Sequence, residues 1–153
     1  MGTRAVIHAD LGKVGYGKDI WIATHYDGNP EKLGRDIVNS IKEEVSKWKK
    51  SFGKDMNIDM GHIIQSAIVK ASAEHHIDSM STTGKKDFTK MYDDFAEYEY
   101  EVMPDGTVKV RTLDGFFTKA KKGEWEKLKG SIPVFSMLKK EISKKKLKEM
   151  IWC

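Results

Sequence analysis

One stretch constrains the fold more than any other, because two alternating runs flank a tight turn. Apolar and acidic residues alternate over 95–103 (FAEYEYEVM), and the alternation resumes at Val108, Val110 and Thr112. Alternation with a period of two is typical of a strand with one buried face. Between the runs stand residues 104–106, Pro-Asp-Gly, where proline fixes φ and glycine accepts a positive φ. The pattern predicts a β-hairpin.

The three-residue loop sets the register that this hairpin should adopt. If the turn is of type I with a glycine bulge, Met103 pairs with Thr107. The expected cross-strand pairs are Val102 with Val108 and Tyr100 with Val110 on the core face, and Glu101 with Lys109 and Glu99 with Arg111 on the solvent face. These ion pairs explain the glutamates as a charged sheet surface rather than as an acid–base pair.

A second hairpin is expected near the N-terminus. Residues 4–9 (RAVIHA) and 19–24 (DIWIAT) are rich in strand-forming residues, and the linker between them is rich in glycine. A phosphate-binding loop would need a helix directly behind these glycines. Because a strand follows them instead, the glycines indicate a long turn.

Helical periodicity follows the second run. Apolar residues recur every three or four positions over 33–52, and a second such stripe runs through 59–74. Further helices are expected at 119–129 and from residue 131 onward, whereas the polar residues 77–87 indicate a loop.

These elements predict an α+β fold, with two β-hairpins in a mostly antiparallel sheet packed with three to five helices. A length of 153 residues favours one domain, 1–153, with a basic helical segment at 119–153. The sequence has no apolar run long enough for a membrane span and no signal-peptide pattern, so we expect a cytoplasmic protein. The one cysteine, Cys153, cannot form a disulfide within the chain.

Charge is distributed unevenly along the chain. Residues 1–118 contain 16 basic and 19 acidic residues, whereas residues 119–153 contain 11 basic and 4 acidic residues. Such a basic segment attracts nucleic acid or other polyanions, although a solvated lysine-rich helix face has the same composition and Trp125 could equally be a core residue. The candidate nucleic-acid-binding residues are Lys121, Lys122, Trp125, Lys139, Lys140, Lys144, Lys145 and Lys146, with Lys119, Lys127, Lys129 and Trp152 in the same segment.

The stretch THYDGNP, residues 24–30, joins the second strand to the first helix. Asn29 suits the N-cap and Pro30 the first helical position. Side chains at such a joint sit on a rigid support, beside backbone N–H groups that favour an anion. We therefore expect a ligand site here, unless these residues serve only the geometry of the turn. The candidates are His25, Tyr26, Asp27, Gly28, Asn29 and Arg35.

The order of these motifs also resembles a known group. RAVIH, a second strand and then HYDG-x-P-x-x-LG-x-D, over about residues 3–40, are similar to small, mostly uncharacterised proteins of phages, prophages and other mobile elements. Those proteins carry an Arg-His-x-Asp-Gly-Tyr-Pro form, in which Thr24 and Asn29 of this chain replace the arginine and the tyrosine. The resemblance implies an accessory role in a mobile element and no particular activity.

Three hypotheses for function follow. The first is non-enzymatic binding of a nucleotide or nucleic acid at the joint, with neither cofactor nor resident metal. The second is metal-assisted hydrolysis of a phosphoester by His25, Asp27 and either His75 or His76, although the sequence has no zinc-ligand spacing. The third is a protein-interaction or assembly module, in which the C-terminal helix and Trp152 dock on a partner.

Overall fold

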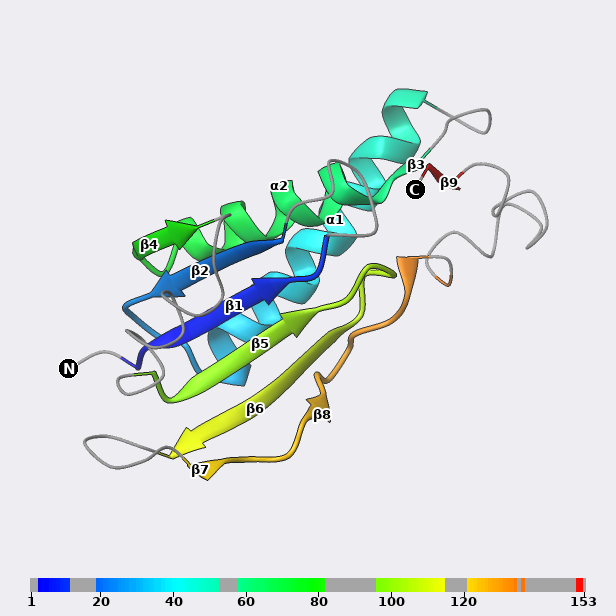
Figure 1. The fold of residues 1–153 in the computed structure, drawn as a ribbon. Helices are drawn as coiled ribbons and strands as arrows, with labels where there is room; N and C mark the ends of the chain where they lie inside the picture. The colour runs from blue at the N-terminus through cyan, green and yellow to red at the C-terminus, as the bar shows by residue number, and fades with distance from the viewer. Residues whose placement is uncertain are drawn as a thin grey trace.

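One sheet, backed by helices on one face, organises the molecule (Figure 1). The computed structural model describes residues 3–11, 19–52, 58–81, 96–114, 121–134, 136 and 151–152. The strands of the main sheet are β1 (Ala5–Ala9), β2 (Ile20–Thr24), β4 (Ile77–Ser81), β5 (Tyr98–Val102), β6 (Val108–Asp114), β7 (Lys121–Lys122) and β8 (Glu126–Lys127). They lie in the order β4-β2-β1-β5-β6-β7, with β8 also paired to β6. Strands β3 (Ile58–Asp59) and β9 (Ile151–Trp152) form a separate pair.

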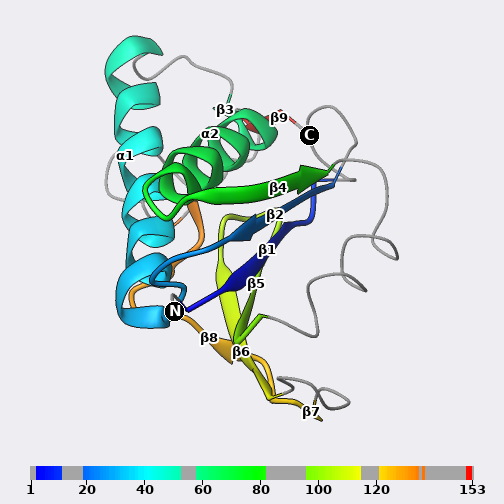
Figure 2. The same cartoon turned by 90° about the vertical axis from the view of Figure 1, so that its left-hand side faces the viewer.

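Helices α1 (Arg35–Phe52) and α2 (Met60–Ala73) lie on the same side of the sheet, and a π-helical turn, η1 (Pro30–Gly34), leads into α1 (Figure 2). Asp59 caps α2 by accepting a hydrogen bond from the His62 N–H at 3.0 Å. Both predicted apolar stripes are confirmed, since Trp48 is partly buried against the core and these members are buried: Leu33, Ile37, Ile41, Val45, Met60, Ile63, Ile64, Ala67, Ile68 and Ala71. They form the main core against Ile7, Ile22 and Tyr100 of the sheet.

The predicted hairpin of β5 and β6 is confirmed, register included. Each of the four expected cross-strand pairs is present. The Met103 N–H donates to the Thr107 carbonyl at 2.8 Å, and Gly106 adopts a φ of +89°. The turn chemistry and the alternation therefore specified this element locally.

The prediction that the glutamates of β5 face solvent is wrong for Glu99. Its exposed fraction is 5%, and its carboxylate accepts two hydrogen bonds from Arg111, at 2.6 and 2.9 Å. The Arg111 guanidinium in turn lies over the Trp125 ring, 4.3 Å from its centroid. Glu101 bonds to His8 of β1. This face of the sheet carries a second, smaller buried cluster, formed by Val6, Trp21, Ala23, Ala96 and Leu113.

The predicted number of helices is also wrong, because the described part of the chain has two α-helices and the short turn η1. Residues 121–129, expected to be helical, instead contribute β7 and β8, which pair with β6. The expected loop at 77–87 contains strand β4, which pairs with β2. Of the expected last helix, Val134 and Ser136 are described as helical, whereas residues 131–133 are not helical and Ile151–Trp152 form β9; the other residues lie outside the described ranges.

The order of the strands was not predicted. Among the described strands, the main sheet has one parallel pairing. The hairpin of β1 and β2 is antiparallel as expected, but β1 also pairs with β5 in parallel. The two hairpins therefore meet through β1 and β5 in a mixed, mostly antiparallel sheet, which confirms the α+β class. Neither helix in the described ranges combines the length and the apolarity that a bilayer crossing requires.

Candidate functional site

The joint between β2 and α1 is held by its backbone. Asp27 has a φ of +52°, a conformation that few residues other than glycine adopt. The Gly28 N–H donates to the Thr3 carbonyl at 2.9 Å, and the Tyr100 hydroxyl donates to the Gly28 carbonyl at 2.6 Å. A Cβ on Gly28 would stand 2.8 Å from the Cβ of Ala5, so only glycine fits here. Gly28 of the HYDG motif is thus hydrogen-bonded to Thr3, just before β1, and to Tyr100 of β5, which fixes the start of η1 against the sheet.

The side chains of the predicted joint site mostly contact one another or nearby residues. Asn29 occupies the expected N-cap position and Pro30 begins η1, although the Asn29 side chain makes no capping bond. Tyr26 is 51% exposed. The other contacts are His25 with Asp78 at 3.0 Å, Asp27 with Lys32 at 3.2 Å and Asn29 with Glu31 at 3.0 Å. Arg35, the one arginine of the predicted set, makes none of these contacts.

Of the histidines of the hydrolase hypothesis, the fold brings His25 and His76 together and pairs His75 with Asp36 instead. His75 is buried and its Nε2 lies 2.6 Å from the Asp36 carboxylate, while its Nδ1 faces the Tyr26 carbonyl at 3.0 Å. His76, with a φ of +61°, lies beside His25 but pairs weakly with Asp78, at 3.7 Å. In the part of the chain that the structure describes, no three His, Cys, Asp or Glu residues are grouped so that they could hold a metal ion.

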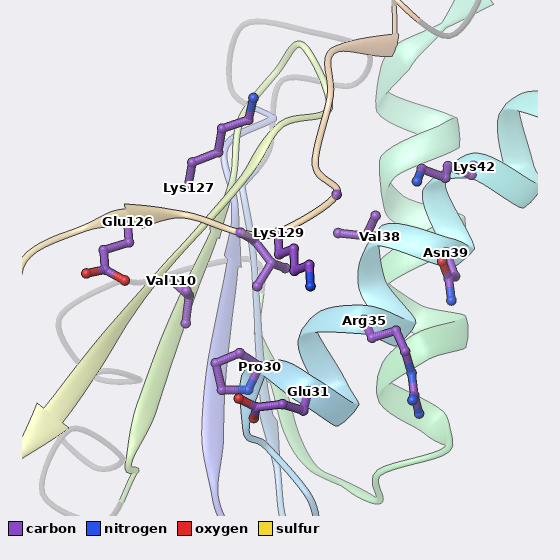
Figure 3. Close-up of a pocket in the computed structure, with 12 residues that line it drawn as sticks. Pro30, Glu31, Arg35, Val38, Asn39, Lys42, Val110, Glu126, Lys127 and Lys129 are labelled. Atoms are coloured by element: carbon purple, nitrogen blue, oxygen red, sulfur yellow. The ribbon is translucent and has the colours of Figure 1, made fainter.

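A cleft of about 680 Å³ opens between the N-terminal half of α1 and the segment around β8 (Figure 3). Its size lies within the range that is usual for small-ligand sites. Its lining contains a cationic, an acidic and an apolar set of residues. Asn39 and Gly130 belong to none of these sets. The cations are Arg35, Lys42, Lys127 and Lys129, the acids Glu31 and Glu126, and the apolar residues Pro30, Val38, Val110 and Leu128.

Packing at the base of the cleft holds its two walls together. Leu128 lies against η1, because a Cβ on Gly34 would be only 3.0 Å from the Leu128 Cδ1. The Leu128 N–H donates to the Val108 carbonyl at 2.9 Å, and the Ser131 hydroxyl accepts from the Val108 N–H at 2.7 Å. The segment that carries Lys127 and Lys129 is therefore hydrogen-bonded to β6. The sheet holds this wall of the cleft in place.

Three of the four cations in the cleft have no acidic partner among the residues that the structure describes. Within the described residues, Lys42, Lys127 and Lys129 form no ion pair, and Arg35 has only a long contact to Asp36, at 3.8 Å. Lys129 extends from one wall toward α1, and Lys42 extends from α1 toward the other wall (Figure 3). Cations at a cleft favour an anionic ligand when no described acidic side chain forms an ion pair with them.

The cleft brings together residues from the two sequence-predicted sets. Arg35 belongs to the joint set, and Lys127 and Lys129 belong to the basic segment. Trp125 packs under Arg111, and Lys121 and Lys122 form β7. The lysines at 139, 140 and 144–146 lie outside the described residues. Lys42 and Asn39 were missed, since on a lysine-rich helix no local signal distinguishes them.

A separate charged cluster lies on the sheet face away from the helices. His8 is stacked on Trp21, with ring centroids 4.7 Å apart, and both of its ring nitrogens face carboxylates. Nδ1 is 3.0 Å from Glu101 and Nε2 is 3.0 Å from Asp19. Burial by itself lowers the pKa of His8, but the hydrogen bonds and charges of Glu101 and Asp19 outweigh it and raise the pKa above its usual 6.5.

This cluster predicts that the protein loses stability as the pH rises. A raised pKa in the folded state stabilises the fold fully below the unfolded pKa, and that contribution disappears as the pH rises through the folded pKa. We expect wild type to exceed His8→Gln in unfolding free energy at about pH 6, and this excess to shrink toward about pH 9, by about 1.4 kcal/mol per unit of pKa shift. Urea unfolding of both proteins across this range measures it. A constant or growing difference would contradict the assignment, since the other histidines are common to both proteins.

Comparison of the chain with protein-family models, with curated proteins and with solved structures gave no match. The geometry of the cleft is therefore the basis for assigning a function.

Proposed function

We propose that the protein binds a phosphate-bearing ligand, a nucleotide or a nucleic acid, in the cleft between α1 and β8, and that it does not transform this ligand. The observation that carries the proposal is the pair of lysines Lys42 and Lys129, which extend from opposite walls into a cleft of ligand size without an acidic partner among the described residues (Figure 3). Phosphate oxygens accept the charge-assisted hydrogen bonds that lysine and arginine donate.

The lining supports binding rather than catalysis. Its described residues include no histidine, serine, threonine or cysteine that could act as a nucleophile or transfer a proton near neutral pH. Its carboxylates, Glu31 on η1 and Glu126 on β8, come from opposite walls of the cleft. Arg35 and the lysines supply positive charge, which raises the rate at which an anion meets the site and makes its affinity depend on salt.

The test is to measure binding of nucleoside diphosphates and of a short single-stranded DNA by calorimetry, for wild type and for cleft variants. Lys42→Gln and Lys129→Gln should each weaken the binding of whichever probe binds by about tenfold, the loss expected for one charge-assisted hydrogen bond. Raising the salt concentration should weaken binding to wild type more than to either variant, because fewer ionic contacts remain in the variants.

Lys50→Gln is the matched control. It removes the same charge from the same helix, but Lys50 is exposed near the end of α1 and does not line the cleft. An equal loss in Lys50→Gln would show that binding is unspecific. Loss of binding in His25→Ala, with the lysine variants unaffected, would place the ligand at the joint. Failure of both probes to bind wild type would contradict the proposal.

A further inference from the structure

The chemistry of the lining narrows the kind of phosphate-bearing ligand. Four apolar residues line the cleft next to the cations: Pro30 is half-buried, and Val38, Val110 and Leu128 present to the cleft the small part of each side chain that the core does not bury. A ligand that carried only phosphate would leave this apolar surface in contact with water. A ligand with a flat, weakly polar ring beside its phosphates would cover it and gain the free energy of apolar burial.

The two carboxylates oppose a continuous polyanion. Glu31 comes from the η1 wall and Glu126 from the β8 wall, so each wall carries a negative charge as well as cations. The Glu31 pKa is lowered by a hydrogen bond from its own backbone N–H and by another from Asn29, so this carboxyl stays ionised. A nucleic-acid strand has a phosphate at every nucleotide and would bring some of them close to these carboxylates.

The same carboxylates suit a single nucleotide. Its phosphates sit at one end of the molecule and can lie among the lysines, while the sugar and base point elsewhere. Carboxylates accept hydrogen bonds from sugar hydroxyls and from the amino groups of bases, and the Asn39 amide both donates and accepts. The cleft volume of about 680 Å³ also corresponds to one small ligand rather than to a track along the surface.

We infer that the ligand of this cleft is a free nucleotide, with its phosphates held by Lys42, Lys129 and Arg35 and its base against Val38, Val110 and Leu128. This inference rests on the proposed function and makes it more specific, since it excludes a polynucleotide as the preferred ligand.

The experiment is a ranking of affinities for the full chain at one salt concentration. The probes are the diphosphates of adenosine, guanosine, cytidine and uridine, together with inorganic pyrophosphate and a short single-stranded DNA. At least one nucleoside diphosphate should bind about tenfold more tightly than pyrophosphate, because the base adds apolar burial. Excess DNA should fail to displace it. Val38→Thr, which keeps the shape of the side chain, should weaken the nucleotide and leave pyrophosphate unchanged.

The outcomes distinguish a failure of the nucleotide inference from a failure of the proposed function. If the DNA binds more tightly than every diphosphate and displaces it from wild type, the nucleotide inference is wrong while the proposed function stands. If pyrophosphate binds as tightly as every nucleotide, the base makes no contact and the inference is again wrong. If no probe binds, both the inference and the proposed function are wrong.

Discussion

Replacing Glu99 by alanine should lower the free energy of unfolding by about 3–5 kcal/mol, because it leaves a largely buried guanidinium without its counter-charge. The Glu99 and Arg111 side chains are only 6% and 17% exposed, and two hydrogen bonds join them. Trp125 covers the guanidinium, so water cannot easily replace the lost carboxylate. Urea unfolding at neutral pH measures the effect.

Two controls separate burial from charge. Glu43→Ala breaks an ion pair of similar length, 2.7 Å to Lys70, but both of its partners are exposed, and we expect no measurable loss. The double variant Glu99→Leu/Arg111→Met should regain much of the stability lost in Glu99→Ala, because it removes both buried charges at once. If Glu99→Ala and Glu43→Ala behave alike, the pair on β5 and β6 is not buried in solution.

Gly28→Ala should destabilise the protein by about 1–3 kcal/mol, the usual cost of adding a methyl group to a packed site. The new Cβ would be 2.8 Å from the Ala5 Cβ and 2.9 Å from the Thr3 carbonyl oxygen, and part of this close contact is with backbone, which moves less readily than a side chain. A shift of the chain here would also strain the hydrogen bond from Tyr100 to the Gly28 carbonyl. Thermal and urea unfolding measure the change.

The partner variant tests the contact itself. In an Ala5→Gly background one of the two close contacts is absent, so Gly28→Ala should cost less than it does in wild type. The remaining contact to the Thr3 carbonyl should keep the rescue incomplete. An equal cost in both backgrounds, or no cost in either, would mean that Gly28 is not seated against β1 as described.

The elements that the sequence predicted correctly depend on residues close together in the chain. The hairpin of β5 and β6 depends on residues within one short stretch, and its register was correct. The segment around Trp125 was misassigned because lysine, glutamate and leucine favour helices, while its true pairing is with the distant strand β6. Gly123 was the contrary signal, since its N–H pairs with Thr112 and a Cβ there would be 2.5 Å from the Thr112 hydroxyl.

The buried face and the cleft depend on contacts between residues far apart in the sequence. Glu99 was expected to face solvent because the pairing of Glu99 with Arg111 says nothing about what covers the sheet. Trp125, from a later segment, lies against the arginine. The cleft likewise joins Lys42 of α1 to Lys129 beyond β8, and only the strand order brings these together. The sequence shows each of these residues, but it does not predict that they lie close together in the fold.

The most direct test of the cleft is an amide NMR titration of the labelled protein with the nucleoside diphosphate that binds best. We expect the largest shift changes on Arg35, Asn39, Lys42 and residues 127–130, which form the two walls. They should be lost in Lys42→Gln/Lys129→Gln and retained in Lys50→Gln. Changes centred on residues 25–28, or on His8 and the opposite face of the sheet, would contradict the assignment of the ligand to this cleft.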